Sequence, residues 1–551
     1  MARIKGMRVI AVLALLTLGT VAPSAQTTRV APAAAERPKL VVLLSVDQMR
    51  GDYIDKFRHQ WTKGLHRLVT EGAWFRDANY PYYTTVTCAG HASIGTGTVP
   101  AVHGMVANSW ADRNNTRTVS CTDDETVKAI SYGPTPNTVG HSARNLMSPT
   151  LADEMRIQVW PTPRVVGISL KARSAINLSG HRPDVVVWLD EREGGWATST
   201  AFATAPVPYL QDFFAKHPMS AEIGRTWNRA MPLDQYLFPY TKENRRRTPH
   251  VTTEFPHIAK GRGEEVGGAI TDAWEASPFS DAYLAAMGMA SLDALKLGRG
   301  PGTDLLAISF SALDLTGHSY GPTSHEVQDI LFRLDEQIGL LLDKLDRDIG
   351  RGQYVVGLSA DHGVAPIPEA MKVEGFDAGR IDYPGMGKAI DSLLARELGP
   401  GTYRTRVMGN DVYLNDGIYS KLTQNPAAME AVLEIVRKTD GVFRVYRKEQ
   451  LSVSDPLTRQ LFLSHYEGRS GDIKFLNKAY WLTGSQSTST HGSGHRYDTH
   501  VPVVLFGFGI KKGEYLEPAA PLDLAPTLAF LTGVTLPDAM GRVLTEALIH
   551  R

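Results

Sequence analysis

Residues 39–49 read KLVVLLSVDQM, an unbroken apolar run that ends in an acid. A short run of this kind, rich in valine and leucine, is typical of a strand that is covered on both faces. Strands covered on both faces belong mainly to parallel sheets, where helices pack on each side. The run therefore predicts a buried strand with Asp47 at its C-terminal end.

The same pattern returns five more times along the chain. The runs are RVVGISLKAR (164–173), DVVVWLD (184–190), DLLAISFSALD (304–314), QYVVGLSADHG (353–363) and VPVVLFGFG (501–509). Amphipathic helical stretches lie between several of them, among them 280–298, 324–349 and 522–534. This alternation predicts an α/β fold with a mostly parallel central sheet flanked by helices. Residues 191–275 and 371–480 break the alternation, and we expect them to form cap insertions over the edge of the sheet.

Charge and composition narrow the class of protein. The 551 residues include 58 Lys+Arg and 58 Asp+Glu, so the formal net charge is zero. A balance of this kind gives no reason to expect a nucleic-acid partner or an acidic tail. Hydrophobic residues make up 43% of the chain, which is typical of globular proteins.

The N-terminus differs in character from the rest of the chain. It has a basic start, an apolar run over about 9–22 and small residues before position 26, the pattern of a signal peptide over residues 1–25. The alternative is a membrane anchor, but the run is shorter than the about 20 residues that a span needs. We expect a periplasmic or secreted protein, with 26–551 as a single domain and no transmembrane span after signal removal. In that compartment Cys88 and Cys121 either form a disulfide or remain free thiols.

Acids and histidines follow several of the predicted strands. They are Asp47, Asp314, His318, Asp361, His362 and His491. Ligands of α/β folds collect beyond the carboxyl ends of the strands, so these side chains are expected to meet there. Mixed carboxylate and imidazole ligands suit zinc better than magnesium or calcium. Six such ligands and one hydroxyl can complete two metal sites, an arrangement that suits in-line phosphoryl transfer.

A two-metal site of this kind needs a nucleophile, and residues 84–104, TTVTCAGHASIGTGTVPAVHG, offer three threonines close together. A threonine hydroxyl is a weak nucleophile that metal coordination can activate. It is best placed at a helix N-terminus, which favours a phosphate anion. The stretch predicts such a helix over Ala89–Ile94, broken by Gly95 and Gly97. The pattern alone leaves open whether Thr84, Thr85 or Thr87 is the nucleophile.

The chain resembles the alkaline phosphatase superfamily. The motifs SVDQMRGDY, TCAGHASIGTGTVPAVHGMVANSW, SLKARSAINLSGH, SFSALDLTGHSYGP, LSADHG and THGSGHRYDTHVPVVLFG match in order over nearly the whole chain after residue 26. Within the superfamily, it is most similar to secreted bacterial alkaline phosphatases with a threonine nucleophile, which are related to nucleotide pyrophosphatase/phosphodiesterases. Sulfatases of the superfamily use C/S-x-P-x-R, a pattern that is absent after Cys88.

The resemblance implies a role for each site residue. Thr87 would be the nucleophile, because it precedes His91 by four positions. One Zn²⁺ would be held by Asp47, Asp361, His362 and the Thr87 hydroxyl, and a second by Asp314, His318 and His491, giving two Zn²⁺ per chain. Asn108, Lys171 and Arg173 would bind the phosphoryl oxygens, whereas His495 and His500 fall outside the ligand positions. Lys171 and Arg173 continue an apolar run, so we expect them on one side of a strand.

These expectations describe a zinc-dependent phosphatase that hydrolyses small-molecule phosphate monoesters through a phospho-threonine intermediate, as a monomer or homodimer. The alternative enzyme is a phosphodiesterase or nucleotide pyrophosphatase on the same fold, and dual action is compatible with the pattern. Aromatic residues could then accept the second ester substituent; they are Trp196, Tyr209, Phe213 and Phe214. A third alternative is a secreted protein that binds metal or phosphate without catalysis, for which a nucleophile is unnecessary.

Overall fold

The computed structural model describes residues 36–549 apart from 113–116, 134–139, 191–194, 242–251, 260–267 and 484–486. The expected signal peptide (1–25) lies outside the described residues. From Arg37 onward the chain forms one compact unit. Within the described residues, none of the helices combines the length and the apolar character needed to span a bilayer.

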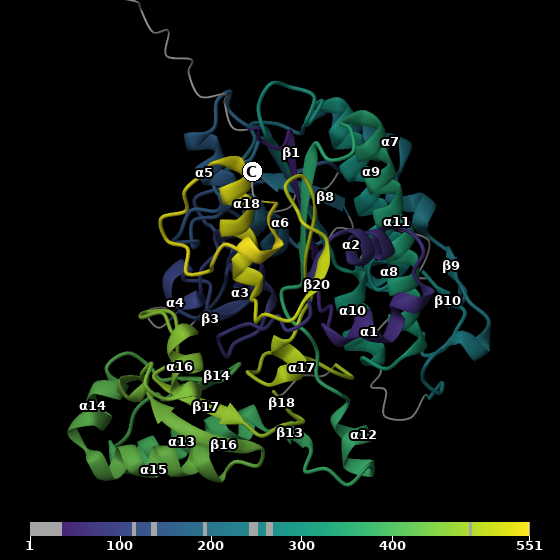
Figure 1. Ribbon diagram of the computed structural model, residues 1–551. Coiled ribbons are helices and arrows are strands. Elements are labelled where there is room, and N and C mark those ends of the chain that lie inside the picture. The colour runs from purple at the N-terminus through teal and green to yellow at the C-terminus, as the bar shows by residue number, and fades with distance from the viewer. Residues whose placement is uncertain are drawn as a thin grey trace, which may run out of the picture. The chain divides into compact units, whose positions relative to one another are not determined.

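A ten-stranded sheet runs through the middle of this unit (Figure 1). Its strands, in spatial order, are β20 (Gly513–Tyr515), β2 (Ala73–Phe75), β19 (Val503–Gly507), β12 (Tyr354–Ser359), β1 (Leu40–Val46), β11 (Asp304–Phe310), β6 (Val165–Ser169), β7 (Val185–Asp190), β8 (Gly195–Ser199) and β5 (Ala129–Ser131). The five strands from β12 to β7 are parallel, which confirms the mostly parallel sheet expected from the apolar runs.

The run at 501–509 does form a strand, but β19 pairs antiparallel with β12 and with β2. Its direction has a consequence for the site. The start of an antiparallel strand lies at the same edge of the sheet as the carboxyl ends of its parallel neighbours. The segment that precedes β19, which contains His491, therefore arrives where β1 and β12 end.

Helices cover both faces of the sheet, which explains why the strands are apolar throughout. In β1, Leu40, Val42 and Leu44 pack into one core and Val41 and Leu43 into another. The first core includes side chains from α2 (Gly64–Glu71), α9 (Pro278–Ala294) and α11 (His325–Asp348), and the second includes α5 (Leu151–Gln158) and α18 (Leu524–Thr532). The helices expected at 280–298, 324–349 and 522–534 correspond to α9, α11 and α18, the last preceded by a 3₁₀ turn over Pro521–Asp523.

The second expected insertion, 371–480, builds a layer of its own, at the lower left of Figure 1. It contains the four-stranded sheet β14–β15–β17–β16, whose strands are Arg406–Met408, Asp411–Tyr413, Ile473–Asn477 and Val442–Arg447. The helices α13 (Tyr383–Glu397) and α15 (Pro426–Lys438) pack on this sheet around a separate hydrophobic core.

The first expected insertion, 191–275, differs from its expectation in two respects. Its beginning is not a cap, because β8 is a strand of the main sheet. Its aromatic residues do not form an open surface either: Trp196 is 3% exposed, and its ring stacks 5.5 Å from Phe214 and 5.3 Å from Tyr283 of α9. Tyr209 donates or accepts a hydrogen bond with Ser291 on the same helix. Trp196 and Phe213 are buried in the core and Tyr209 and Phe214 pack against it, so the four rings do not form the open aromatic surface that was expected for the second substituent of a diester.

Candidate metal and phosphoryl site

One group of acid and imidazole side chains gathers where β1 and β12 end. Asp47 follows β1, and Asp361 and His362 follow β12, its neighbour in the sheet. All three are buried, and their ligand atoms lie within 4.8 Å of one another. His362 Nε2 is 3.5 Å from Asp47 Oδ1 and 3.2 Å from Asp361 Oδ2. A single cation could contact all three side chains.

A second group forms beside the first. Asp314 and His318 lie one turn apart on α10 (Ala312–Tyr320), which directly follows β11. His491 joins them from the segment before β19, and the ligand atoms again lie within 4.8 Å of one another. The ring of His491 stacks on that of His362 with centroids 3.4 Å apart, so the two groups adjoin.

Backbone carbonyls orient the three imidazoles. The Nδ1 atoms of His318, His362 and His491 lie 2.8, 2.9 and 2.9 Å from the carbonyl oxygens of Ser489, Gly363 and Thr85. A hydrogen bond from Nδ1–H to a carbonyl leaves the lone pair on Nε2, which is the tautomer that binds metal. In all three residues Nε2 is the atom on the side of the carboxylates.

Several polar atoms of the first group have no hydrogen-bond partner among the described residues. They are Asp47 Oδ1, Asp361 Oδ2 and His362 Nε2, all buried. Buried polar atoms are nearly always satisfied, because leaving one unpaired costs about 1–3 kcal/mol. Three such atoms converging on one point fit a bound cation. The mixture of carboxylate and neutral imidazole donors is one that zinc accepts.

The pKa shifts of the ligand groups reflect their burial and their mutual charges. Burial and the neighbouring Asp314 and Asp361 raise the pKa of Asp47 well above its usual value, a sign of uncompensated negative charge. Burial would raise the pKa of Asp361 too, but His362 and His91 hold it below its usual value. Burial lowers the pKa of His491 well below its usual value, with His362 adding to the effect, which keeps its ring neutral. Metal ligands must be deprotonated. The lowered pKa values of Asp361 and His491 favour that form, whereas Asp47 would need the positive charge of a bound cation to stay ionised.

Thr87 is the first residue of α3 (Thr87–Thr96), at the end of the helix where the first backbone N–H groups have no carbonyl partner within the helix. Gly90 lets this helix approach β12, because a Cβ there would overlap the carbonyl oxygen of Asp361. The helix is longer than the expected Ala89–Ile94. Gly97, with φ of 74°, ends it, whereas Gly95 lies inside it against the carbonyl of Asn177. Gly95 is therefore a packing residue and not a break.

Asn108 lies beside Thr87 and is held from two directions. Its Oδ1 accepts from the backbone N–H of Cys88 (2.9 Å), and its carbonyl accepts from the N–H of Cys121 (2.9 Å). The two cysteines form a disulfide, which answers a question that the sequence left open. With Oδ1 used in this way, the amide's two N–H donors are its remaining hydrogen-bonding groups.

Lys171 and Arg173 do not lie on one side of a strand, contrary to the sequence-based expectation. β6 ends at Ser169, Lys171 caps α6 (Ala172–Ser179), and Arg173 lies in its first turn. Lys171 Nζ donates to Asp47 Oδ2 (2.6 Å) and Asp314 Oδ2 (2.5 Å), which brings it between the two ligand groups. Burial opposes its charge, but the two carboxylates raise its pKa above the usual value.

Arg173 differs from most arginines of this protein. Within the described part of the chain it makes no hydrogen bond or ion pair, and its Nε is buried. Its positive charge acts to lower the pKa of Lys171, because two like charges that lie close together repel each other. A partly buried guanidinium with unused donors is suited to an anion.

Other histidines of the motifs lie outside the two groups. His495 Nε2 is 3.0 Å from the carbonyl of Asn477, and His500 Nε2 is 2.9 Å from that of Arg76, so both have structural partners. His91 contacts one residue of the first group: its Nδ1 is 3.2 Å from Asp361 Oδ2, and its Nε2 is 2.8 Å from Ser309 Oγ.

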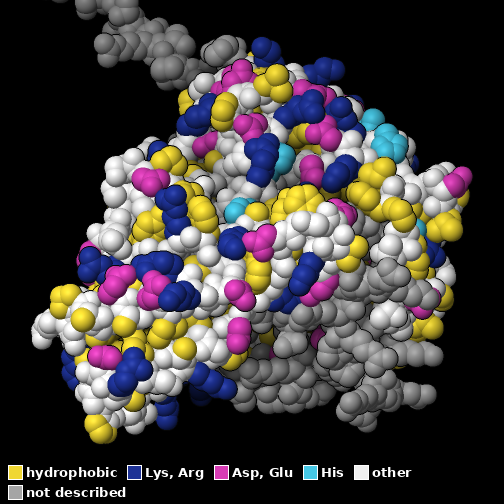
Figure 2. All heavy atoms as spheres, turned by 90° about the horizontal axis from the view of Figure 1, so that it is seen from below, with side chains coloured by type: hydrophobic (Ala, Val, Ile, Leu, Met, Phe, Trp, Pro, Cys, Tyr) yellow, Lys and Arg dark blue, Asp and Glu magenta, His cyan; other side chains and the backbone are white. Residues whose placement is uncertain are grey.

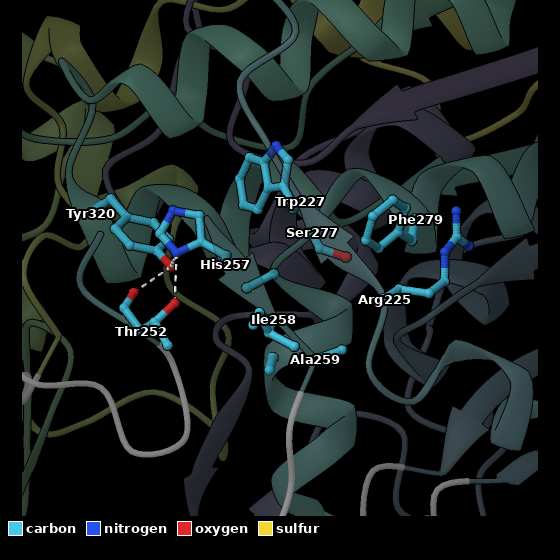
Figure 3. A pocket seen from close by; sticks show the side chains of 11 residues that line it. Arg225, Trp227, Thr252, His257, Ile258, Ala259, Ser277, Phe279 and Tyr320 are labelled. Atoms are coloured by element: carbon cyan, nitrogen blue, oxygen red, sulfur yellow. Dashed lines mark hydrogen bonds between the residues drawn. The ribbon is translucent and has the colours of Figure 1, made fainter. Parts of the chain in front are cut away.

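A separate small cavity lies beside α10 (Figure 3). Its lining includes Trp227, His257, Phe279 and Tyr320, and none of its residues belongs to either ligand group. His257 Nδ1 is 2.8 Å from Thr252 Oγ1 and 3.2 Å from the Tyr320 hydroxyl, and the dashed lines in Figure 3 run to the two oxygen atoms of Thr252. Residues of the first insertion thus line this cavity together with Phe279 of α9 and Tyr320 of α10. Sequence reasoning gave no signal for it.

Gln48 is a further residue at the site that sequence reasoning missed. It follows Asp47 directly, is 1% exposed, and hydrogen-bonds to carboxylates of both groups. The carbonyls of Thr85, Gly363 and Ser489 were also missed, because any residue type supplies a carbonyl and no sequence pattern marks it.

Comparison with known proteins agrees with the geometry. The family model described as type I phosphodiesterase / nucleotide pyrophosphatase matches residues 41–500. Alkaline phosphatase PafA of Elizabethkingia meningoseptica is 32% identical over 541 residues, which are 95% of this chain and 96% of that protein. Alkaline phosphatase PhoV of Synechococcus elongatus is 29% identical over 94% of each chain.

Solved structures give the same picture. The crystal structure of wild-type PafA has a TM-score of 0.85 at 30% identity and covers 94% of this chain and 100% of its own. A PafA variant in which a threonine, an asparagine, a lysine and an arginine are replaced has a TM-score of 0.86. Murine ectonucleotide pyrophosphatase / phosphodiesterase 5 has a TM-score of 0.53 at 14% identity over 92% of this chain, and thus shares the fold.

Proposed function

Since the chain belongs to the type I phosphodiesterase / nucleotide pyrophosphatase family of the alkaline phosphatase superfamily, and is a hydrolase of phosphate esters, we propose that it is a zinc-dependent alkaline phosphatase. In this proposal it hydrolyses small-molecule phosphate monoesters through a covalent intermediate on Thr87. The observation that carries it is the convergence of two ligand groups on the N-terminus of α3. We further propose that residues 1–25 are a signal peptide and that the enzyme acts in the periplasm or outside the cell.

Two Zn²⁺ ions per chain are proposed, one held by Asp47, Asp361, His362 and the Thr87 hydroxyl, the other by Asp314, His318 and His491. The unpartnered atoms of the first group and the carbonyl-fixed imidazoles of both support this assignment. When bound, zinc would supply Lewis-acid stabilisation of negative charge on the reacting oxygens.

Thr87 attacks phosphorus, and the ester oxygen leaves from the opposite side as the bond to the Thr87 oxygen forms. Water then cleaves the threonine–phosphate bond, which releases phosphate and restores the hydroxyl. Thr87 lies at the N-terminus of α3, and a helix N-terminus favours an anion. Gly90 contributes by letting Thr87 lie close to the end of β12.

Three side chains would stabilise the negative charge on the non-bridging oxygens of the phosphoryl group. The N–H donors of Asn108 are unused by its bond to Cys88. Arg173 has an unpartnered Nε, and Lys171 lies between the ligand groups. Preorganised donors of this kind stabilise charge that develops in the transition state. A monoester dianion carries one more charge than a diester, so two additional cations favour monoesters.

The alternative function is that of a phosphodiesterase or nucleotide pyrophosphatase. The family whose model matches this chain is described by these two activities. The burial of Trp196 and Phe213 in the core removes the aromatic surface that would have favoured it. A protein that only binds metal or phosphate would not need a hydroxyl at the start of α3.

The test compares kcat/KM for an aryl monoester and the matching diester in four proteins. These are the wild type, Lys171→Ala, Arg173→Ala and, as a control, Arg444→Ala, whose side chain is exposed on β16. Hydrogen bonds to charged groups contribute about 1.5–3 kcal/mol, so each site variant should lose about 10- to 100-fold on the monoester. The diester should lose much less, and Arg444→Ala nothing. A wild type that prefers the diester, or equal losses on both substrates, would overturn the assignment.

A further inference from the structure

We infer that Gln48 is a positioning residue that fixes the carboxylates of both ligand groups relative to each other. Its backbone N–H donates to Asp361 Oδ1 of the first group (3.1 Å). Its side-chain Nε2 donates to Asp314 Oδ1 of the second group (2.6 Å). Asp47, the remaining carboxylate, is its chain neighbour. One residue thus contacts or adjoins every carboxylate of the site.

The backbone at Gln48 adopts a conformation that this residue type rarely takes. Its φ is 68°, and only two other non-glycine residues of the described ranges, Lys296 and Tyr480, have positive φ. The N–H of Met49 donates to the carbonyl of Val46 (3.1 Å), so Gln48 occupies the third position of a tight turn. Turns with positive φ at that position favour glycine or asparagine. A strained residue that persists beside a functional site indicates that its side chain is needed there.

The surroundings are shaped to receive this carboxamide. Gln48 is 1% exposed. Gly317, which lies between Asp314 and His318 on α10, leaves room for Oε1, because a Cβ at that position would overlap it. The amide also has the advantage that it is uncharged. It donates a hydrogen bond to Asp314 without a positive charge that would repel a cation, as Lys171 would.

This inference rests on the proposed zinc site, and its test reads zinc binding and stability instead of turnover. The decisive variant is Gln48→Gly, which relieves the backbone strain and removes the amide. Zinc affinity is measured by competition with a chelating dye, and the stability of the zinc-free protein by its urea midpoint. Loss of a hydrogen-bond partner of a ligand typically weakens metal binding by about 10- to 100-fold. We expect that loss together with an equal or higher urea midpoint, because glycine accepts positive φ without strain.

Two variants control the comparison. Gln48→Asn tolerates positive φ and keeps an amide, but it is one methylene too short to reach Asp314, so it should also bind zinc more weakly. Lys296→Gly relieves the same kind of strain at an exposed position outside the site, so it should leave zinc affinity unchanged. If Gln48 only supported the fold, its loss would lower the urea midpoint. Weaker zinc binding together with an equal or higher urea midpoint in Gln48→Gly would therefore point to a role at the site.

The two proposals fail in distinguishable ways. If the wild type binds two zinc ions and Gln48→Gly binds them with the same affinity, the positioning role is wrong and the zinc site stands. If Gln48→Gly lowers the urea midpoint of the zinc-free protein together with zinc affinity, Gln48 serves the fold and the positioning role is overturned. If the wild type binds no zinc at all, the proposed function itself is overturned.

Discussion

The negative charge of the three buried carboxylates is only partly compensated by neighbouring side chains. Asp47, Asp314 and Asp361 are buried together, and Lys171 is the cation that contacts two of them. Burial opposes the charge of Asp314, yet Lys171 and His318 hold its pKa well below the usual value. One lysine cannot neutralise three carboxylates, and the raised pKa of Asp47 reflects this excess. The excess of negative charge is what makes the site receptive to cations.

Outside the site, His181 is a residue whose charge should stabilise the fold. Its Nδ1 is 2.9 Å from Asp153 Oδ2 and its Nε2 is 3.0 Å from the carbonyl of Leu146. Both nitrogens can donate only in the protonated ring. Burial opposes that charge, but Asp153 raises the pKa of His181 above its usual 6.5.

The sign of the pH dependence follows from that shift. A histidine with a raised pKa in the folded state contributes its full stability below the unfolded value of 6.5, and loses it as the pH rises through the folded value. The difference in Tm between the wild type and His181→Gln should therefore be larger at pH 5.5 than at pH 9. Titration of the proposed zinc ligands affects both proteins alike at each pH. The same difference at both pH values would contradict the assigned ion pair.

At the scale of elements, the disulfide joins the start of α3 to the hairpin of β3 (Ser109–Ala111) and β4 (Thr118–Ser120). Asn108 lies between the two half-cystines and bonds to the backbone of each. The disulfide therefore sets the position of the Asn108 amide relative to Thr87. An oxidising compartment, which the expected signal peptide would provide, is the environment where such a bond persists.

Breaking the disulfide should lower activity through Asn108. We expect Cys121→Ser to reduce monoester kcat/KM by about 10-fold, a fraction of the about 100-fold that an oxyanion donor can contribute. In an Asn108→Ala background the same substitution should cost little further, because the two changes act through one group. Zinc content, measured in the same preparations, should remain unchanged. Additive losses in the double variant would show that the disulfide acts elsewhere.

The elements also show what was predictable from sequence. The apolar runs located β1, β11 and β12, and the acids at their ends reached the expected edge because parallel strands end together. The direction of β19 was not visible, since an apolar strand reads the same in either direction. The turn after Ser169 was missed because SLKAR contains no glycine or proline to mark it. Gly95 was misjudged because helix packing and helix termination both use glycine.

At the scale of the whole molecule, the site joins segments from distant parts of the chain. Ser464 of the second insertion accepts from the backbone N–H groups of Tyr83 and Thr84, which lead into α3. The insertion thus helps to hold the approach to Thr87. On the face shown in Figure 2, Lys and Arg side chains alternate with Asp and Glu, as the zero net charge suggests. The described residues on this face thus do not form the basic stripe that is typical of a nucleic-acid-binding surface.

Removing zinc should destabilise the whole protein and not only the site. Without cations, the three buried carboxylates repel one another across strands β1, β12 and helix α10. A ligand present at about 1,000 times its Kd stabilises the folded state by about 4 kcal/mol per site. Chelation should therefore lower Tm, and added Zn²⁺ should restore it while Mg²⁺ should not. A Tm that chelation leaves unchanged would contradict the two-metal site.

The central claim is a phosphate bond to Thr87, and it can be tested directly. The enzyme is mixed with excess monoester, quenched in acid during turnover, digested, and analysed by mass spectrometry with fragmentation of the peptide that contains Thr84, Thr85 and Thr87. The account predicts phosphate on Thr87, its absence in Thr87→Ala, and its retention in Thr85→Ala. Phosphate on another residue, or undiminished turnover by Thr87→Ala, would contradict it.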